Sequence, residues 1–193
     1  MADGTLKVGT ITTSSGSGTI TLGQSGETVD MANGTITLNS NMKSTPAFSA
    51  YINAASFQFA ENSWTKLQMY GEDFDTDGAY DTSNARFTIP AGAAGKYNFN
   101  IQLRSINNHT IRFLIGLYKN GSKQSTAETR VAFGSGTTFP CVSLTDRVDA
   151  AVGDYFEAYA YHTNTGGDNG VKGASSSTAT RETWWSANKI IGA

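Results

Sequence analysis

One short segment has the residue spacing of a metal site. Asp73, Asp75 and Asp77 alternate along the chain and Gly78 follows them, which matches the first half of a calcium-binding loop, Asp-x-Asp-x-Asp-Gly. Calcium takes about six to eight oxygen ligands, and this spacing turns alternate carboxylates inward while the glycine makes the sharp turn. The last position of such a loop needs a bidentate Glu, but it is Asn84 here, and no helical pattern flanks the segment. The segment therefore predicts either a calcium site or an acidic surface turn.

The sequence contains few residues that could act as a catalytic nucleophile or as its base. A thiol nucleophile needs a nearby base, and nothing around Cys141 marks His109 or His162 as that base. We therefore expect Cys141 to be a buried thiol on a strand. No hydrolase, zinc-protease or phosphate-binding motif is present. We expect a protein that is not an enzyme, although a two-carboxylate glycosidase stays open because the sequence does not show which acids meet in space.

The segment Thr163–Thr180 is rich in Gly, Ser, Thr and Asn, which predicts an exposed loop. Recognition often takes place on loops that a rigid scaffold positions. An uninvolved flexible loop fits the same composition. Five side chains in or beside this loop could contact a glycan or a neighbouring subunit: His162, Asn164, Asp168, Asn169 and Lys172.

The composition predicts that short strands, rather than helices, position these residues. The 193 residues include 25 Thr, 21 Gly, 19 Ser and 14 Asn, and only 16% are charged. Thr is β-branched and favours strands, while Gly and Asn supply turns. The net charge of −2 argues against a nucleic-acid partner, which needs a basic surface. No apolar run is long enough for a membrane span, a single cysteine excludes an intrachain disulfide, and the N-terminus does not read as a secretory signal.

Three strands are predicted by clear alternation. Apolar residues alternate with Asn, Gln and Arg over 97–104, and Ile111, Phe113, Ile115 and Leu117 repeat the pattern before an Asn-Gly hairpin turn. Over 155–161 one face is apolar, whereas the other carries tyrosines. A strand face of Tyr, or of Asn and Gln, can lie against a neighbouring subunit or face solvent. The tyrosines considered for a subunit interface are Tyr155, Tyr159 and Tyr161.

Further strands complete an all-β sandwich or jelly roll. The stretch 47–60 is rich in alanine and is compatible with a helix or a strand. Shorter strands are expected at 57–59, 65–70, 86–89, 131–133, 142–144 and 183–191.

The chain divides near Pro46. Residues 1–45 contain no aromatic residue and repeat Gly-Thr-Ile-Thr at 9–12, 18–21 and 34–37, which predicts an extended β arm. Such an arm has too few large side chains to form its own core, so we expect it to pair with copies of itself or to dock on a partner. Residues 46–193 hold every aromatic residue and form the expected globular domain.

Residues 46–193 resemble a C1q/TNF-like jelly-roll domain. The resemblance rests on ordered blocks, of which Ala85-Arg-Phe87-Thr-Ile-Pro90 followed by Gly95-Lys-Tyr97-Asn-Phe99 is the most specific. Pro46-Ala-Phe48-Ser-Ala50, Leu117-Tyr-Lys-Asn-Gly121 and Val152-Gly-Asp154-Tyr-Phe156 are similar to further strands of that family. The resemblance implies a ten-stranded sandwich that assembles as a tight homotrimer.

The arm of residues 1–45 looks like repetitive segments of bacteriophage tail-fibre and head-decoration proteins, and it replaces the collagen stalk of animal family members. Together the two resemblances imply a virion structural protein, either a trimeric fibre or spike or a capsid-decoration knob, found outside the cell after release. Other virion proteins would bind the arm, and a host-surface glycan or protein would contact the knob. A free C1q-like recognition module is the alternative, and a polysaccharide depolymerase is a weaker one.

Overall fold

A computed structural model of the chain separates into two units, Met1–Thr37 and Leu38–Ala193. The arm of residues 1–45 lies almost wholly outside the described residues, so its β structure and its partners stay predictions. The residues that the structure describes are Gly26, 43–106, 111–131, 139–163, 169–174 and 180–190.

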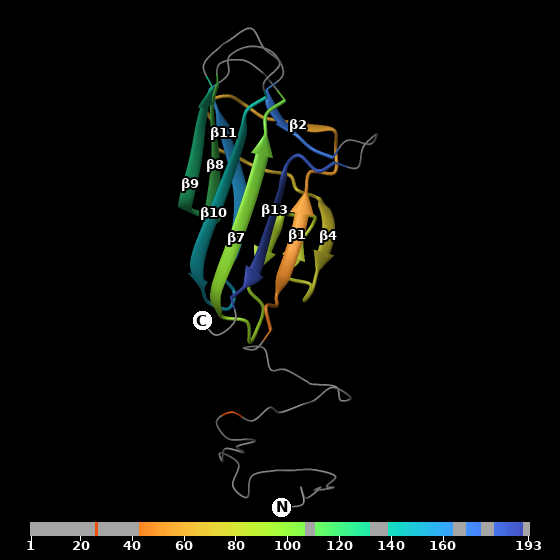
Figure 1. Ribbon diagram of the computed structural model, residues 1–193, viewed down its shortest axis with the longest axis vertical. Helices are drawn as coiled ribbons and strands as arrows, with labels where there is room; N and C mark the ends of the chain where they lie inside the picture. Colours follow the sequence, from red (N-terminus) through yellow and green to blue (C-terminus); the bar gives the residue numbers. More distant parts are fainter. Residues whose placement is uncertain are drawn as a thin grey trace, which may run out of the picture. The chain divides into compact units, whose positions relative to one another are not determined.

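The domain is a sandwich of two antiparallel sheets (Figure 1). The first sheet has the order β10-β7-β13-β1-β4 and the second has the order β5-β6-β11-β8-β9, with β3 also paired to β11. The strands of the first sheet are β1 (Ala47–Tyr51), β4 (Gly71–Asp75), β7 (Gly95–Arg104), β10 (Cys141–Ala150) and β13 (Trp184–Lys189). Those of the second are β3 (Thr65–Lys66), β5 (Tyr80–Asp81), β6 (Arg86–Thr88), β8 (Ile111–Lys119), β9 (Ser122–Val131) and β11 (Tyr155–His162).

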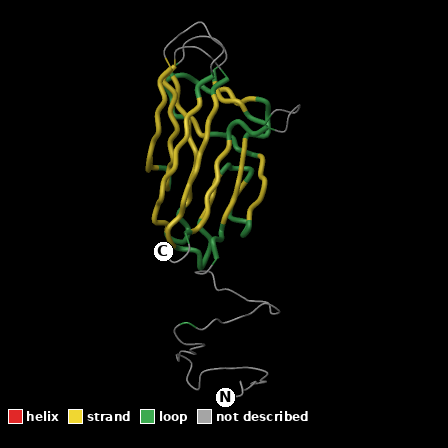
Figure 2. Tube along the Cα trace, viewed as in Figure 1, coloured by secondary structure: helices red, strands yellow, loops and turns green. Residues whose placement is uncertain are grey.

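A two-stranded ribbon of β2 (Ser56–Gln58) and β12 (Gly170–Lys172) completes the described strands. Figure 2 shows strands joined by loops and turns, and the described part of the chain contains no helix. It accordingly contains no helix that could span a membrane. The expected all-β class is confirmed.

Aromatic rings from both sheets fill the space between them. Phe48 of β1 stacks on Tyr80 and Phe87 at ring-centre distances of 4.7 and 4.6 Å, and its edge contacts Trp185 at 4.7 Å. The ring centre of Phe99 of β7 lies 4.5 Å from that of Phe156, which belongs to β11 of the opposite sheet. All of these side chains are buried. The alternation along the strands thus places one face of each sheet in a common core.

The predicted Asn-Gly hairpin between β8 and β9 is confirmed. Asn120 and Gly121 have φ angles of 51° and 77°, the left-handed conformation that a tight two-residue turn requires. The Asn120 side chain also donates to Asp154 at 2.7 Å and accepts the backbone N–H of Tyr155 at 2.9 Å. The turn is therefore tied to the start of β11.

Several strand predictions were incomplete. The segment 47–60 forms β1 and β2 rather than a helix, β9 extends over ten residues where only its end was expected, and β4 covers part of the acidic segment. The predicted loop at 163–180 contains β12, where Val171 is fully buried. Most of β9 carries Ser, Thr and charged residues, so its sequence lacks the apolar alternation that marks a strand.

The prediction of a buried Cys141 was wrong, because this thiol is exposed. Cys141 is the first residue of β10, whose burial alternates, with Val142 and Leu144 facing the core. Residue 141 therefore points away from the core, as the period of a strand requires.

Candidate binding surface

The outward side of the second sheet, here called the aromatic face, carries rings and charges. The expected alternation of β11 is confirmed: Phe156, Ala158 and Ala160 are buried in the core, and the tyrosines of the strand lie on the other side. Strands β8 and β9 and the residues around β3 add further side chains to this face. Its aromatic members are Trp64, Tyr118, Tyr155, Tyr159 and Tyr161, and all five are partly exposed.

The rings of the aromatic face form one connected cluster. Tyr118 stacks on Tyr159 with a ring-centre distance of 4.0 Å, and Trp64 lies 6.1 Å from Tyr118 and 5.5 Å from Tyr161. The Nζ of Lys123 lies 4.1 Å from the centre of the Trp64 ring. The tyrosine hydroxyls are in part engaged, since Tyr161 donates to Asn62 at 3.2 Å. Neighbouring rings hold each other in place, so the cluster presents a preorganised surface.

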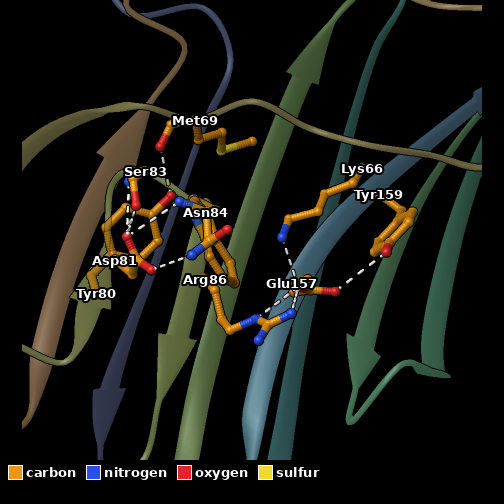
Figure 3. A network of polar contacts seen from close by, with 10 residues as sticks. Lys66, Met69, Tyr80, Asp81, Ser83, Asn84, Arg86, Glu157 and Tyr159 are labelled. Carbon is orange, nitrogen blue, oxygen red and sulfur yellow. Dashed lines mark hydrogen bonds and ion pairs between the residues drawn. The ribbon is translucent and has the colours of Figure 1, made fainter.

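A buried carboxylate, Glu157, lies beside this cluster (Figure 3). Its Oε1 accepts from Lys66 Nζ at 2.7 Å and from Arg86 Nε at 2.9 Å, and Oε2 accepts from the Tyr159 hydroxyl at 3.3 Å. Burial opposes ionisation of Glu157, but the hydrogen bonds from the two cations outweigh it and lower its pKa. Arg86 in turn covers the Tyr155 ring at 4.0 Å. This network ties β3, β6 and β11 together and is a satisfied ion pair at neutral pH.

Burial also acts on the phenol groups of the aromatic face. It raises the pKa of Tyr118, and together with the negative charge of Glu157 it raises the pKa of Tyr159 to about 12. Both hydroxyls therefore stay protonated at neutral pH and can donate hydrogen bonds.

A second ion-pair group lies on β8 and β9. Glu128 accepts from Arg112 at 2.9 and 2.8 Å and also pairs with Arg130, and these bonds hold the pKa of Glu128 at about 2. The outward charged residues of the sheet are Lys66, Arg86, Arg112, Lys123 and Arg130 against Asp81, Glu128 and Glu157. Five cations against three carboxylates leave this face with a net charge of +2, whereas the whole chain carries −2.

A small hollow borders the aromatic face at Lys66. It has a volume of about 170 Å³ and is lined by Lys66, Leu67, Gln68, Tyr70, Ser83, Asn84 and Ala85. Hydrogen bonds from Ser83 and Asn84 hold the Asp81 carboxylate in the adjoining turn and lower its pKa to about 2 (Figure 3). Most of the residues that line the hollow are polar, and the hollow is open to solvent. It thus differs from the enclosed apolar cleft of a small-molecule site.

The outward side of the first sheet, here called the polar face, has a different chemistry. The register aligns Ser49, Ser186, Asn100 and Thr145 in one row across four strands, and the Thr145 hydroxyl donates to Asn100 at 3.0 Å. Charged residues lie at the ends of β7 and on the edge strands β4 and β10. The centre of this face is uncharged and consists of Ser49, Asn98, Asn100, Gln102, Ser143, Thr145, Ser186 and Asn188.

The three aspartates of the predicted calcium loop have protein partners. Asp73 accepts from the Ser49 hydroxyl at 3.1 Å and pairs with Arg181, and Asp77 accepts from the Thr76 hydroxyl at 2.6 Å. Asp75 accepts the backbone N–H groups of Asp77 and Tyr80 at 3.2 and 2.7 Å. Among the residues that the structure describes, no group of three or more His, Cys, Asp or Glu side chains could hold a metal ion. The geometry matches the acidic turn, the alternative that the sequence left open, and calcium binding stays a prediction.

His162 does not lie on an exposed loop as expected. It is the last residue of β11 and fully buried, with its Nε2 3.0 Å from the carbonyl oxygen of Phe59 and its ring 4.8 Å from the Phe59 ring. Of the other loop candidates, Asn169 is partly exposed, and Lys172 places its Nζ 4.7 Å from the centre of the Phe139 ring. Asn164 and Asp168 lie outside the described residues, so a binding role for this loop stays a prediction.

The sequence interpretation did not assemble the aromatic face. Tyr118 lies one residue beyond Leu117, the last apolar position of the expected strand, although the observed β8 includes it, and Trp64 precedes a strand of only two residues. The glycine at position 116, within a strand of large residues, was the available signal. A glycine inside a strand often marks a close approach by another group.

Comparison with known proteins identifies the fold. No protein-family model matches the chain, and no curated protein matches it in sequence. The globular domain of the zebrafish complement 1qA protein matches 75% of this chain and 96% of its own length, with 16% identity and a TM-score of 0.51. The Eiger TNF of S. frugiperda matches 76% of this chain and 93% of its own, with 10% identity and a TM-score of 0.53. The expected jelly-roll architecture is thereby confirmed.

Proposed function

Because the described sandwich has the jelly-roll fold of C1q and TNF domains, we propose that the protein is a homotrimeric, non-enzymatic knob of a bacteriophage particle. It would serve as a fibre, a spike or a capsid decoration and would be extracellular after release. The resemblance of residues 1–45 to phage repeat segments supports this context. The arm would attach the knob to other virion proteins, and the knob would face the host.

The contrast between the two sheet surfaces is the observation that supports the polar face as the interface between subunits of the trimer. Burying the aromatic face between copies would desolvate and crowd several cations, which is unfavourable. The centre of the polar face is uncharged, and its Ser, Asn and Thr side chains can hydrogen-bond to a second copy at little electrostatic cost. The polar face therefore lies against the neighbouring subunits, and the aromatic face points outward.

An interface through Tyr155, Tyr159 and Tyr161 is the competing arrangement. No observation tests it directly, but these rings already contact Arg86, Tyr118 and Trp64 within the chain. The Asn and Gln face of β7, which the sequence also indicated as a possible interface, lies on the other sheet and supports the polar-face arrangement.

Light scattering on two matched variants separates the arrangements. Ser186→Arg places a charge at the centre of the polar face, and Thr126→Arg places one at an exposed position of β9 on the aromatic face. We expect the wild type and Thr126→Arg to be trimers and Ser186→Arg to be a monomer. A trimeric Ser186→Arg together with a monomeric Thr126→Arg would move the interface to the aromatic face, and a monomeric wild type would refute the proposal.

Truncation tests the virion role. A chain that begins at Pro46 should still form trimers but should no longer enter particles, because it lacks the arm. Incorporation of the truncated chain would contradict the attachment role of the arm, whereas absence of the full-length chain from particles would favour the second candidate, a free C1q-like recognition module. Release of reducing sugar ends from host polysaccharide by the purified trimer would instead favour a depolymerase.

A further inference from the structure

We infer that the aromatic face binds an acidic polysaccharide, with Trp64 and Lys123 at the centre of the site. This inference rests on the proposed function, because that arrangement leaves the aromatic face outward on every subunit. It adds to the function the chemical class of the ligand, a chain of uronate sugars.

The ring cluster has the properties of a sugar platform. The C–H face of a pyranose packs on the electron-rich face of an aromatic ring, and its hydroxyls bond to groups at the ring edges. Trp64 provides the largest ring, and it is flanked by Tyr118 at 6.1 Å and Tyr161 at 5.5 Å. The rings pack on one another within the chain, so little side-chain entropy is lost when a ligand binds.

The charge of the face selects an acidic sugar. Its net charge of +2 lies on a chain whose net charge is −2, so this face attracts anions more than the chain as a whole does. Arg112 and Arg130 are held by Glu128, and Lys66 and Arg86 by Glu157. These groups add positive potential but are already paired.

Lys123 is the cation placed to bind a carboxylate. Its side chain is exposed, and its Nζ rests 4.1 Å from the centre of the Trp64 ring. A cation over an exposed ring gains little energy, whereas a charge-assisted hydrogen bond to a carboxylate gains more. When a uronate packs on Trp64, the ammonium can move from the ring to the sugar carboxylate. Lys123 therefore tests the charge contact, and Trp64 tests the sugar contact.

The probe is tetragalacturonate, and its methyl ester is the matched neutral ligand. The wild-type full-length chain is titrated with each ligand by calorimetry, and light scattering on the same sample reports the oligomeric state. We expect the acid to bind about tenfold more tightly than the ester, with an affinity that falls as salt is added. The indole N–H signal of Trp64, assigned by its loss in Trp64→Phe, should shift on binding.

Two variants locate the site. Lys123→Gln should weaken binding of the acid about fivefold and should leave binding of the ester unchanged. Trp64→Phe should weaken both ligands about tenfold, because both sugars pack on the ring. Lys96→Gln removes an exposed cation from β7 of the opposite sheet and should change neither affinity.

Equal affinity for acid and ester, an equal loss in Lys96→Gln, or equally tight binding of a single-stranded DNA oligonucleotide would each overturn the inference. Failure here is separable from failure of the proposed function. A trimer that does not bind the acid contradicts only the glycan site, and a monomer that binds it contradicts only the trimer.

Discussion

Trp64 lies so close to the backbone of β8 at Gly116 that no side chain fits between them. A Cβ at residue 116 would be 2.8 Å from the Trp64 ring and 2.9 Å from the Tyr118 ring. Both distances are shorter than Cβ atoms adopt in proteins, so the rings would have to move. The glycine is therefore the feature of the sheet that lets the aromatic cluster form.

We expect Gly116→Ala to displace Trp64 and to destabilise the domain by about 1–3 kcal/mol, the usual effect of forcing an extra group into a packed site. Urea unfolding followed by tryptophan fluorescence measures the loss, and the Trp64 indole signal reports the displacement. Thr126→Ala is the control, because Thr126 is exposed and pairs with Gly116 across the strands. Equal stability of the wild type and Gly116→Ala would show that Trp64 can leave the sheet without loss.

The Glu157 network gives a second prediction. Glu157→Gln keeps the size of the side chain but leaves Lys66 and Arg86 without their shared carboxylate. Those two side chains are 29% and 38% exposed, so water can solvate them, and we expect a loss of about 1–2 kcal/mol, below that for a fully buried pair. The variant also adds one unit of positive charge to the aromatic face.

Calorimetry with tetragalacturonate then separates stability from binding in this variant. We expect Glu157→Gln to bind the acid more tightly than the wild type does, although its domain is less stable. A parallel loss of stability and of affinity would show that the network acts only by holding the fold. Asp149→Asn, at an exposed position of β10 on the opposite sheet, is the charge-matched control.

The fold was largely predictable from sequence because its main signals are local. The alternation in β7, β8 and β11 and the Asn-Gly turn depend on residues close together in the chain, and each was confirmed. The candidate surface was not predictable in this way. Trp64 meets Tyr118 and Tyr161 only after β3, β8 and β11 pair, and those pairings join residues far apart in sequence.

The errors have a physical cause of the same kind. His162 was assigned to a loop because Gly, Ser and Thr follow it, yet its place on the inward side of β11 buries it under Phe59. The Asp-x-Asp-x-Asp spacing is a different case, because it suits both a calcium loop and a strand end where Asp75 caps the following turn, and calcium binding stays a prediction.

Asp154 links the folding free energy to pH. Hydrogen bonds from Lys119 and Asn120 lower the pKa of its carboxyl from 3.8 to about 2. A carboxyl whose pKa is lowered by folding stabilises the fold at every pH above the unfolded value, and this contribution is lost as the pH falls toward the folded value. We expect the stability difference between the wild type and Asp154→Asn to be constant above about pH 5 and to shrink between pH 3.8 and about 2. Unfolding curves across this range measure it, and a difference that grows as the pH falls would contradict the assignment.

Replacement of the buried Lys189 by an apolar residue should increase the stability of the domain. Lys189 lies on the core side of β13 opposite Tyr97, only 2% exposed, and its Nζ has no hydrogen-bond partner in the described part of the chain. An unpaired cation in the interior is unfavourable, and its replacement by an apolar side chain of similar length often stabilises a protein by about 1–3 kcal/mol. We therefore expect Lys189→Met to raise the midpoint of thermal unfolding, whereas Lys96→Met, at an exposed position of β7, should leave it nearly unchanged. A lower midpoint for Lys189→Met would contradict this expectation and would show that the Lys189 side chain contributes favourably to the fold.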